Sequence, residues 1–254
     1  MMTLKIAEDI YLVGDGHIRL SDPRDCHVYL IDGGTETGLV DAGSGLATNQ
    51  IMVNIRRDGL HPERLSFLVV THSHADHGGG AHDFKAITGC EVYAPTVEAD
   101  FLDNGGKDME VALGLAKKSK VYPRNFTYKH CKVDKVLKDQ QTIRVGKYTL
   151  KTIQVPGHSH GIVCLLLEGG RSKTLFSSDV VFLGGTVGLG NWPGCSLDAY
   201  RDNIGKLGGL GVRALFPGHF LWTLKDGQKH IDTAINNLKQ VWVPPAWQHK
   251  HPHA

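Results

Sequence analysis

The residues of this sequence best suited to chemistry lie in one short segment, residues 69–80, VVTHSHADHGGG. Three histidines and an aspartate stand close together there: His72, His74, Asp76 and His77. His72 and His74 are two residues apart, so in an extended segment both side chains point to the same side. Imidazole and carboxylate are usual ligands of zinc and also suit iron and manganese. A solvated polar turn is the alternative, but this spacing after an apolar strand favours a metal site.

Further strand-like runs also end in a histidine or an aspartate beside small turn residues. The candidate ligands at these ends are Asp41 in GLVDAG, His158 in TIQVPGH, Asp179 in TLFSSD and His219 in RALFPGH. Strands of one layered fold can present their ends at a shared rim, which would bring these side chains together. His27 and His160 are further candidates. Each could contact the pocket, or could only hydrogen-bond to its own surroundings.

Short apolar runs separated by glycine-rich turns make up much of the chain. They predict strands at 10–13, 27–31, 38–41, 67–70, 91–94, 148–155, 162–168, 173–176 and 213–216. Apolar residues at helical spacing predict helices over 197–207, after a Ser196 cap, and over 226–242, after an Asp226 cap. Residues 45–58 and 108–119 carry weaker helical patterns. This mixture predicts an α/β fold in which helices cover sheets.

No repeat and no linker divides the 254 residues, so we expect a single domain over residues 1–254. Residues 96–140 are a long polar stretch between two strands, with one helix predicted from Asp108 to Lys118. This insertion could be a substrate-side lid or a surface excursion. The tail at 246–254 is expected to be disordered.

Composition narrows the classes of function. The formal net charge is +2 and 21% of residues are charged, which gives no long-range field to hold nucleic acid or an anionic membrane. Charged residues at 5, 8 and 9 interrupt the apolar run that a signal peptide needs, and no segment approaches a membrane span. The five cysteines are scattered without a CxxC. We therefore expect a cytoplasmic protein with reduced thiols that binds no nucleic acid and no membrane. The sequence leaves the oligomeric state open, a homodimer included.

The motifs, taken in order, resemble the metallo-β-lactamase-fold superfamily. The matching residues are D-A-G at 41–43, H-x-H-x-D-H at 72–77, G-H at 157–158, Asp179 and P-G-H at 217–219. They cover the chain from about residue 25 to 220. The resemblance implies a four-layer αβ/βα sandwich with a dinuclear metal site at one edge.

The same resemblance implies the ligands. One metal takes His72, His74 and His158, a second takes Asp76, His77 and His219, and Asp179 bridges them. Asp41 would orient a ligand histidine, or would only cap the turn before Gly43. No cysteine stands among the ligands, so we expect two zinc ions, with iron or manganese as alternatives. Zinc is redox-inert, so the expected chemistry is hydrolysis. A metal-bridged hydroxide attacks a carbonyl, and Asp76 and Asp179 are the catalytic ligands.

The substrate is predicted to be a small acyl compound. SSDVVFLGG, residues 177–185, is similar to the stretch around the bridging aspartate of glyoxalase II, the hydroxyacylglutathione hydrolases, which favours a thioester. Those enzymes hold glutathione with a helical C-terminal domain, whereas 35 residues follow His219 here, so another acyl thioester stays open.

The alternative is a lactonase of the acyl-homoserine lactonase type. These enzymes carry a tyrosine where this chain has Phe182, although Tyr93, Tyr122 or Tyr128 could replace it. An iron-dependent sulfur or oxygen redox enzyme, a phosphodiesterase and a β-lactamase are ranked lower. The complete ligand set argues against the redox enzyme, and the balanced charge argues against the phosphodiesterase. The β-lactamase is ranked low because such enzymes are usually exported and the N-terminal residues do not resemble a signal peptide.

Overall fold

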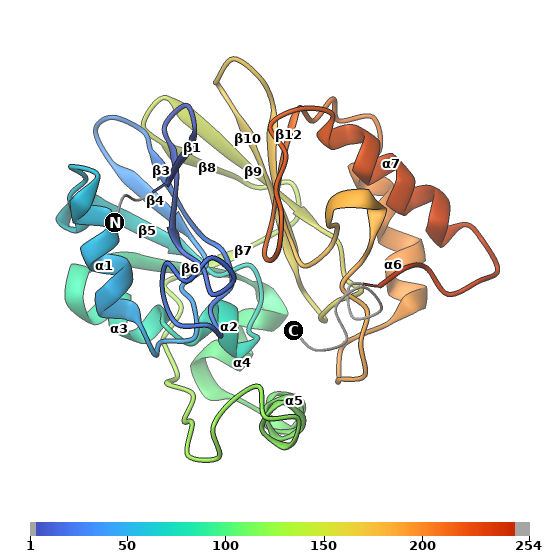
Figure 1. The fold of residues 1–254 in the computed structure, drawn as a ribbon, viewed down its shortest axis with the longest axis horizontal. Helices are drawn as coiled ribbons and strands as arrows, with labels where there is room; N and C mark the ends of the chain where they lie inside the picture. Colours follow the sequence, from blue (N-terminus) through green and yellow to red (C-terminus); the bar gives the residue numbers. More distant parts are fainter. Residues whose placement is uncertain (1–3, 247–254) are drawn as a thin grey trace. The chain divides into compact units, whose positions relative to one another are not determined.

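A computed structural model describes residues 4–246 of the chain (Figure 1). They form two compact units, and each unit is built on one mixed β-sheet with helices packed against it. The first unit runs to Leu137 and takes in Arg144–Lys147, and the second comprises Lys138–Ile143 and the residues from Tyr148 onward. Between residues 4 and 246, no helix has the length and apolar character needed to cross a membrane. The single domain over 1–254 stays a prediction.

The sheet of the first unit has seven strands arranged in chain order. They are β1 (Leu4–Ala7), β2 (Ile10–Gly14), β3 (Val28–Asp32), β4 (Thr37–Val40), β5 (Leu65–Val69), β6 (Glu91–Pro95) and β7 (Lys135–Leu137). Pairs from β1 to β4 are antiparallel, and pairs from β4 to β7 are parallel. The five strands predicted in this part of the chain are confirmed as β2 to β6. Because β4 and β5 run in the same direction, the segments after Val40 and Val69 leave the sheet at one edge.

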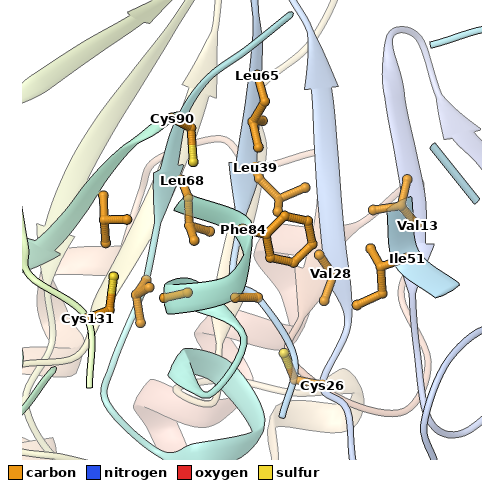
Figure 2. Close-up of a cluster of buried hydrophobic side chains, with 14 of the residues drawn as sticks. Val13, Cys26, Val28, Leu39, Ile51, Leu65, Leu68, Phe84, Cys90 and Cys131 are labelled. Atoms are coloured by element: carbon orange, nitrogen blue, oxygen red, sulfur yellow. The ribbon is translucent and has the colours of Figure 1, made fainter. Parts of the chain in front are cut away.

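Helices bury the apolar side chains of this sheet. They are α1 (Thr48–Arg57), α3 (Ala81–Thr88) and α4 (Thr96–Asn104). Figure 2 shows Phe84 of α3 beside Leu39 and Leu68 of the sheet, and Ile51 of α1 beside Val13. All five side chains are almost fully buried. Truncating one of them would cost about 2–5 kcal/mol, so this core holds the strand ends in place.

The insertion at 96–140 contains two helices, α4 and α5 (Lys107–Lys118), whereas the sequence predicted one. The predicted helix from Asp108 is confirmed as α5. Helix α4 was missed because it follows Pro95 directly, and no side-chain hydrogen bond caps it. Apolar side chains of the insertion join the core of the first unit: Leu102, Tyr122, Phe126, Tyr128, Cys131 and Val133. The insertion as far as Leu137 therefore belongs to this unit, and its action on a substrate stays a prediction.

The sheet of the second unit has five strands in the order β12-β11-β10-β9-β8. They are β8 (Thr142–Val145), β9 (Tyr148–Gln154), β10 (Val163–Glu168), β11 (Thr174–Ser178) and β12 (Ala214–Pro217). The pairs among β9, β10 and β11 are antiparallel, and β11 and β12 are parallel. The four strands predicted here are confirmed as β9 to β12. Parallel pairing brings the residues after Ser178 and after Pro217 to the same edge.

Two helices of the second unit follow the prediction in part. Helix α6 (Leu197–Asn203) begins after Ser196, whose hydroxyl accepts a hydrogen bond from the Ala199 N–H at 3.2 Å, so the predicted cap is confirmed. Helix α7 (Gly227–Leu238) ends four residues earlier than predicted. Asp226 stands at the predicted N-cap position, but its side chain makes no cap hydrogen bond.

The end of the described chain is tied to the second unit. Val187 donates its N–H to the Pro245 carbonyl at 3.1 Å, and Val187 and Ala246 form an isolated β-bridge. Apart from Ala246, the tail predicted to be disordered lies outside the described residues.

Candidate metal centre

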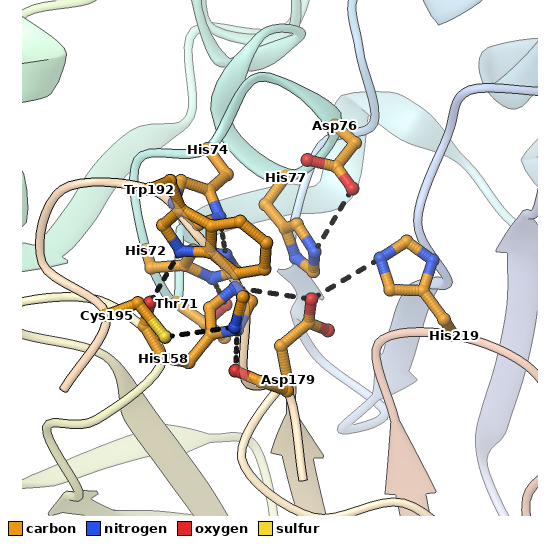
Figure 3. Close-up of polar contacts among 12 residues, drawn as sticks. Thr71, His72, His74, Asp76, His77, His158, Asp179, Trp192, Cys195 and His219 are labelled. Carbon is orange, nitrogen blue, oxygen red and sulfur yellow. Dashed lines mark hydrogen bonds and ion pairs between the residues drawn. The ribbon is translucent and has the colours of Figure 1, made fainter. Parts of the chain in front are cut away.

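Four of the predicted ligands gather where β5 ends in the first unit. His72 Nε2 lies 3.0 Å from His74 Nδ1, and the His72 and His77 rings are 4.1 Å apart between centroids. Asp76 Oδ2 lies 3.7 Å from His77 Nε2 (Figure 3). The extended segment after β5 carries the first two histidines, and the one-turn helix α2 (Ala75–Gly78) carries Asp76 and His77. This strand–loop–helix turn therefore concentrates three imidazoles and one carboxylate.

Asp41 fixes the ring of His77. Its Oδ2 lies 2.9 Å from His77 Nδ1, and its Oδ1 accepts the N–H of Thr71 at 2.8 Å. An ionised carboxylate can only accept, so Nδ1 carries the proton and Nε2 keeps its lone pair. This contact directs Nε2 away from Asp41, and the role of Asp41 in orienting a metal ligand stays a prediction.

The glycines after His77 allow the turn at Asp41 to approach closely. A Cβ on Gly80 would stand 2.2 Å from the Ala42 carbonyl oxygen, and one on Gly79 would stand 2.4 Å from that of Ser44. Ala42 donates its N–H to the His77 carbonyl at 2.8 Å. The run of glycines thus permits backbone contact between the two motifs, which a side chain would block.

Cys26 lies against this cluster and was not singled out in the sequence. Its sulfur, an Asp41 oxygen and a His77 nitrogen all lie within 4.8 Å of one another. Burial raises the pKa of the Cys26 thiol far above its usual value, despite the opposing effect of His77. Cys26 also belongs to the hydrophobic core of the first unit, so it packs beside His77.

Glu98 holds the loop that carries the first two histidines. Its Oε2 accepts the Ser73 N–H at 2.9 Å and the Ser73 hydroxyl at 2.6 Å. The carboxylate comes from α4 and is 1% exposed. Ser73 stands between His72 and His74, so this contact restrains both neighbours. Sequence reasoning missed Glu98 because it missed the helix.

The other three predicted ligands gather at the sheet edge of the second unit. His158 follows β9, Asp179 follows β11 and His219 follows β12. Asp179 Oδ2 lies 3.5 Å from His158 Nε2 and 3.5 Å from His219 Nε2 (Figure 3). One carboxylate oxygen is thus shared between two imidazoles.

Neighbouring groups also fix His158. Its Nδ1 lies 2.7 Å from the Gly188 carbonyl oxygen and donates to it, which leaves Nε2 facing Asp179. The Trp192 indole N–H donates to the His158 carbonyl at 2.9 Å, and the two rings meet edge to face at 5.2 Å. Trp192 was not predicted, because a tryptophan in a glycine-rich loop gives no pattern that places it.

Non-glycine residues with positive φ stand at or beside predicted site residues. The φ angles are 62° at Asp41, 46° at Ser178 and 67° at Phe220. Such conformations cost about 1–3 kcal/mol each and persist where surrounding contacts enforce them. Ser178 precedes Asp179, and Phe220 follows His219. The backbone strain therefore lies at Asp41 itself and at the residues directly beside Asp179 and His219.

His27 lies inside the first unit. It is 1% exposed; its Nε2 lies 2.6 Å from Asp15 Oδ2, and its Nδ1 lies 2.8 Å from the Tyr29 hydroxyl. The structure thus places His27 in a buried polar network, the second of the two roles considered for it.

His160 and Phe182 belong to the second unit. His160 is exposed and lies against Gly194, where an added Cβ would stand 2.8 Å from the ring. Phe182 is buried and meets the Phe220 ring edge to face at 5.9 Å. Phe182 therefore packs beside the turn that carries His219 and brings no hydroxyl to it.

The donors in both units suit zinc. Each cluster offers imidazole nitrogens and carboxylate oxygens, and one ring nitrogen of His77 and of His158 is already held by a neighbour. Zinc binds such donors at about 2.0–2.2 Å, and metal-binding histidines usually donate their second N–H to a carboxylate or a carbonyl. The residues present therefore fit the metal that the sequence motifs imply.

Comparison with known proteins adds a family and a fold. The family model of the Metallo-beta-lactamase superfamily matches residues 21–219. An acyl-coenzyme A thioesterase, MBLAC2 from Gallus gallus, is 29% identical over 211 residues, which are 76% of this chain and 72% of that protein. An atrochrysone carboxyl ACP thioesterase from Aspergillus fumigatus is 26% identical over 195 residues. That match covers 76% of this chain, which spans 50% of the thioesterase's length.

A probable polyketide biosynthesis zinc-dependent hydrolase, BaeB from Bacillus velezensis, is 28% identical over 177 residues, covering 68% of this chain and 64% of that protein. Among solved structures, the metallo-beta-lactamase GOB-18 from Elizabethkingia meningoseptica superposes with a TM-score of 0.70 at 22% identity. The superposition covers 94% of this chain and 90% of that one. A likeness at this identity shows a shared fold, so the predicted α/β sandwich is confirmed.

Proposed function

Because the chain belongs to the metallo-beta-lactamase superfamily, we propose that it is a metal-dependent hydrolase that cleaves an acyl thioester. The observation that carries the proposal is the arrangement of the predicted ligands. In each unit the imidazoles and carboxylates lie within a few ångströms of one another, and hydrogen bonds at Nδ1 fix His77 and His158 so that Nε2 faces Asp76 or Asp179.

Two zinc ions are proposed as cofactors. His72, His74 and His158 would hold one ion, Asp76, His77 and His219 would hold the other, and Asp179 would be a ligand common to both. Zinc at these positions would polarise the substrate carbonyl and activate water near neutral pH. Iron and manganese bind the same donors and stay as alternatives.

Four groups of the protein itself are proposed to position the ligands and to accept a proton. Asp41 keeps the Nδ1 proton of His77, and the Gly188 carbonyl keeps that of His158, so neither ring must reorient during turnover. Asp76 is the more open carboxylate, with 24% of its side chain exposed against 6% for Asp179. We assign Asp76 to accept the proton of the attacking water, and Asp179 to hold the imidazoles apart.

A thioester on a pantetheine arm is the proposed substrate. The names of two relatives state acyl-CoA and ACP thioesterase activity, and both carriers present their acyl group on such an arm. A thiolate with a pKa of about 8.5 is a good leaving group, so a thioester needs little help from an acid as its bond breaks. Acyl-glutathione offers the same bond and is the nearest competitor.

The tyrosines named as substitutes in the lactonase alternative do not favour it. The Tyr93 hydroxyl donates to Glu91 at 2.7 Å and accepts from Lys135 at 2.9 Å. Tyr122 and Tyr128 are buried, and burial raises the pKa of both phenols. Phe182 stands where the lactonases carry their tyrosine. No observation on these residues therefore supports a tyrosine that assists lactone cleavage.

The test is a substrate panel on the zinc-loaded protein: acyl-CoA, acyl-ACP, acyl-glutathione and acyl-homoserine lactone. We expect a pantetheine thioester to be cleaved faster than the lactone by more than about tenfold, or 1.4 kcal/mol at the transition state. Faster turnover of the lactone would reverse the assignment.

The Asp179→Ala variant tests the ligand set in the same assay. Loss of a residue that hydrogen-bonds to a metal ligand lowers metal affinity or activity by about 10–100-fold. Loss of a ligand itself should therefore lower activity and metal content further. Asp198→Ala is the control, because that carboxylate of α6 is 89% exposed. If Asp179→Ala kept the metal and the rate of the wild-type protein, the proposed centre would be wrong.

A further inference from the structure

We propose that Tyr200 is a positioning residue, whose buried hydroxyl fixes Asp179 and His158 for metal binding. The inference rests on the metal centre of the proposed function and adds a residue outside the ligand set. Tyr200 comes from α6, which carries none of the predicted ligands.

The hydroxyl of Tyr200 reaches two backbone carbonyls of the candidate centre. It lies 3.1 Å from the Asp179 oxygen and 3.3 Å from the Gly188 oxygen, and the side chain is fully buried. A hydroxyl has one proton, so it is shared between the two carbonyls. Both partners are carbonyl oxygens, which can only accept, so the hydroxyl is the donor in each contact.

The contact with Gly188 extends to His158. The same carbonyl oxygen accepts the Nδ1 proton of His158 at 2.7 Å. A Cβ on Gly188 would stand 2.3 Å from the Asp179 oxygen and 2.6 Å from His158 Nδ1, so only glycine permits this approach. Tyr200 thus restrains the carbonyl that sets the ring orientation of His158.

The contact with Asp179 acts on a strained segment. Ser178, with a φ of 46°, directly precedes Asp179, and its carbonyl accepts the Gly218 N–H at 2.8 Å. Strand β11 ends at Ser178, so Asp179 is the first residue beyond the sheet. A hydrogen bond from Tyr200 stabilises the one backbone orientation that keeps the carboxylate between the two imidazoles.

The aromatic ring has a separate role from the hydroxyl. It packs on Gly157, where an added Cβ would stand 2.3 Å from the ring atom Cγ. Replacing Tyr200 by phenylalanine keeps this packing and removes only the hydroxyl. The two roles can therefore be separated by one substitution.

The experiment compares Tyr200→Phe with the wild-type protein and with Tyr148→Phe, which removes a hydroxyl from another buried tyrosine of the same unit. Zinc affinity is measured by competition with a chromogenic chelator, and the cobalt-substituted proteins are compared by visible absorption. We expect Tyr200→Phe to lower zinc affinity by about 10–100-fold and to change the cobalt spectrum, as for outer partners of metal sites. Tyr148→Phe should change neither.

A second measurement needs no metal. The proton NMR signal of His158 Nδ1–H, identified by its loss in His158→Gln, should shift in metal-free Tyr200→Phe, because the carbonyl it binds is released. Wild-type zinc affinity, cobalt spectrum and proton signal in Tyr200→Phe would reduce Tyr200 to a packing residue and overturn the proposal. A wild-type protein that binds no zinc would instead overturn the metal centre itself.

Discussion

Individual side chains in this protein are held by partners that set what they can bind. His77 and His158 each have one ring nitrogen occupied, by Asp41 and by the Gly188 carbonyl. His27 differs, because Asp15 and Tyr29 contact its two ring nitrogens. The second ring nitrogens of His77 and His158 face the predicted ligands Asp76 and Asp179, whereas both ring nitrogens of His27 face groups outside the predicted ligand set.

Asp15 provides a prediction for stability against pH. Burial opposes its ionisation, but the hydrogen bond and charge of His27, together with the Ile18 N–H and His17, outweigh burial and hold the pKa of Asp15 below its usual 3.8. A carboxylate with a lowered folded-state pKa adds stability above the unfolded value, and that stability is lost as the pH falls through the folded value. Asp15→Asn should therefore lower the free energy of unfolding at pH 7 by about 3–5 kcal/mol.

Urea unfolding between pH 7 and pH 3 measures this difference. It should shrink once the pH falls below about 4, where Asp15 of the unfolded chain takes up a proton, and shrink further as the folded carboxylate loses its charge at lower pH. Asp198→Asn, at an exposed position, serves as the control. An equal loss of stability at pH 7 and pH 3 would show that charge on Asp15 plays no part.

Among the elements, α4 connects the insertion to the candidate centre. Its buried Glu98 accepts two hydrogen bonds from Ser73, between His72 and His74. Hydrogen bonds to a charged group contribute about 1.5–3 kcal/mol each, so this helix restrains the loop that carries two predicted ligands.

Glu98→Ala is predicted to lower zinc affinity by about tenfold or more, since it releases Ser73 and both neighbouring histidines. Glu98→Gln should recover part of the loss, because the amide oxygen can take the place of Oε2 and accept from both the Ser73 N–H and its hydroxyl. Chelator competition gives the affinities, with exposed Asp100→Ala of the same helix as the control. Unchanged affinity in a folded Glu98→Ala protein would contradict this role.

At the scale of the whole molecule, the proposed ligands are spread from His72 to His219, so metal binding should depend on the folded chain. A ligand that binds only the folded state stabilises it by about 2.7 kcal/mol at a concentration 100 times its dissociation constant. We therefore predict that zinc raises the melting temperature and that a chelator lowers it. Calorimetry with zinc, with magnesium and with a chelator checks this. Equal melting temperatures in all three would count against a zinc centre.

The sequence by itself was enough for the family and for most strands, because both depend on local patterns. A buried strand reads as a continuous apolar run, and a ligand follows its end within a few residues, as His72, Asp179 and His219 do. The family match over residues 21–219 agrees with this interpretation. Helix α4 escaped detection because its apolar spacing is weak and its start has no capping side chain.

Only the tertiary structure placed the residues that hold the ligands. Glu98 bonds to Ser73 across 25 positions of the chain, Tyr200 to Asp179 across 21, and Trp192 to His158 across 34. Hydrogen bonds over such separations form because packing brings the elements together, and no local pattern records them. The motifs named the groups that can bind a metal, whereas packing decided which nitrogen and which carboxylate oxygen each of them presents.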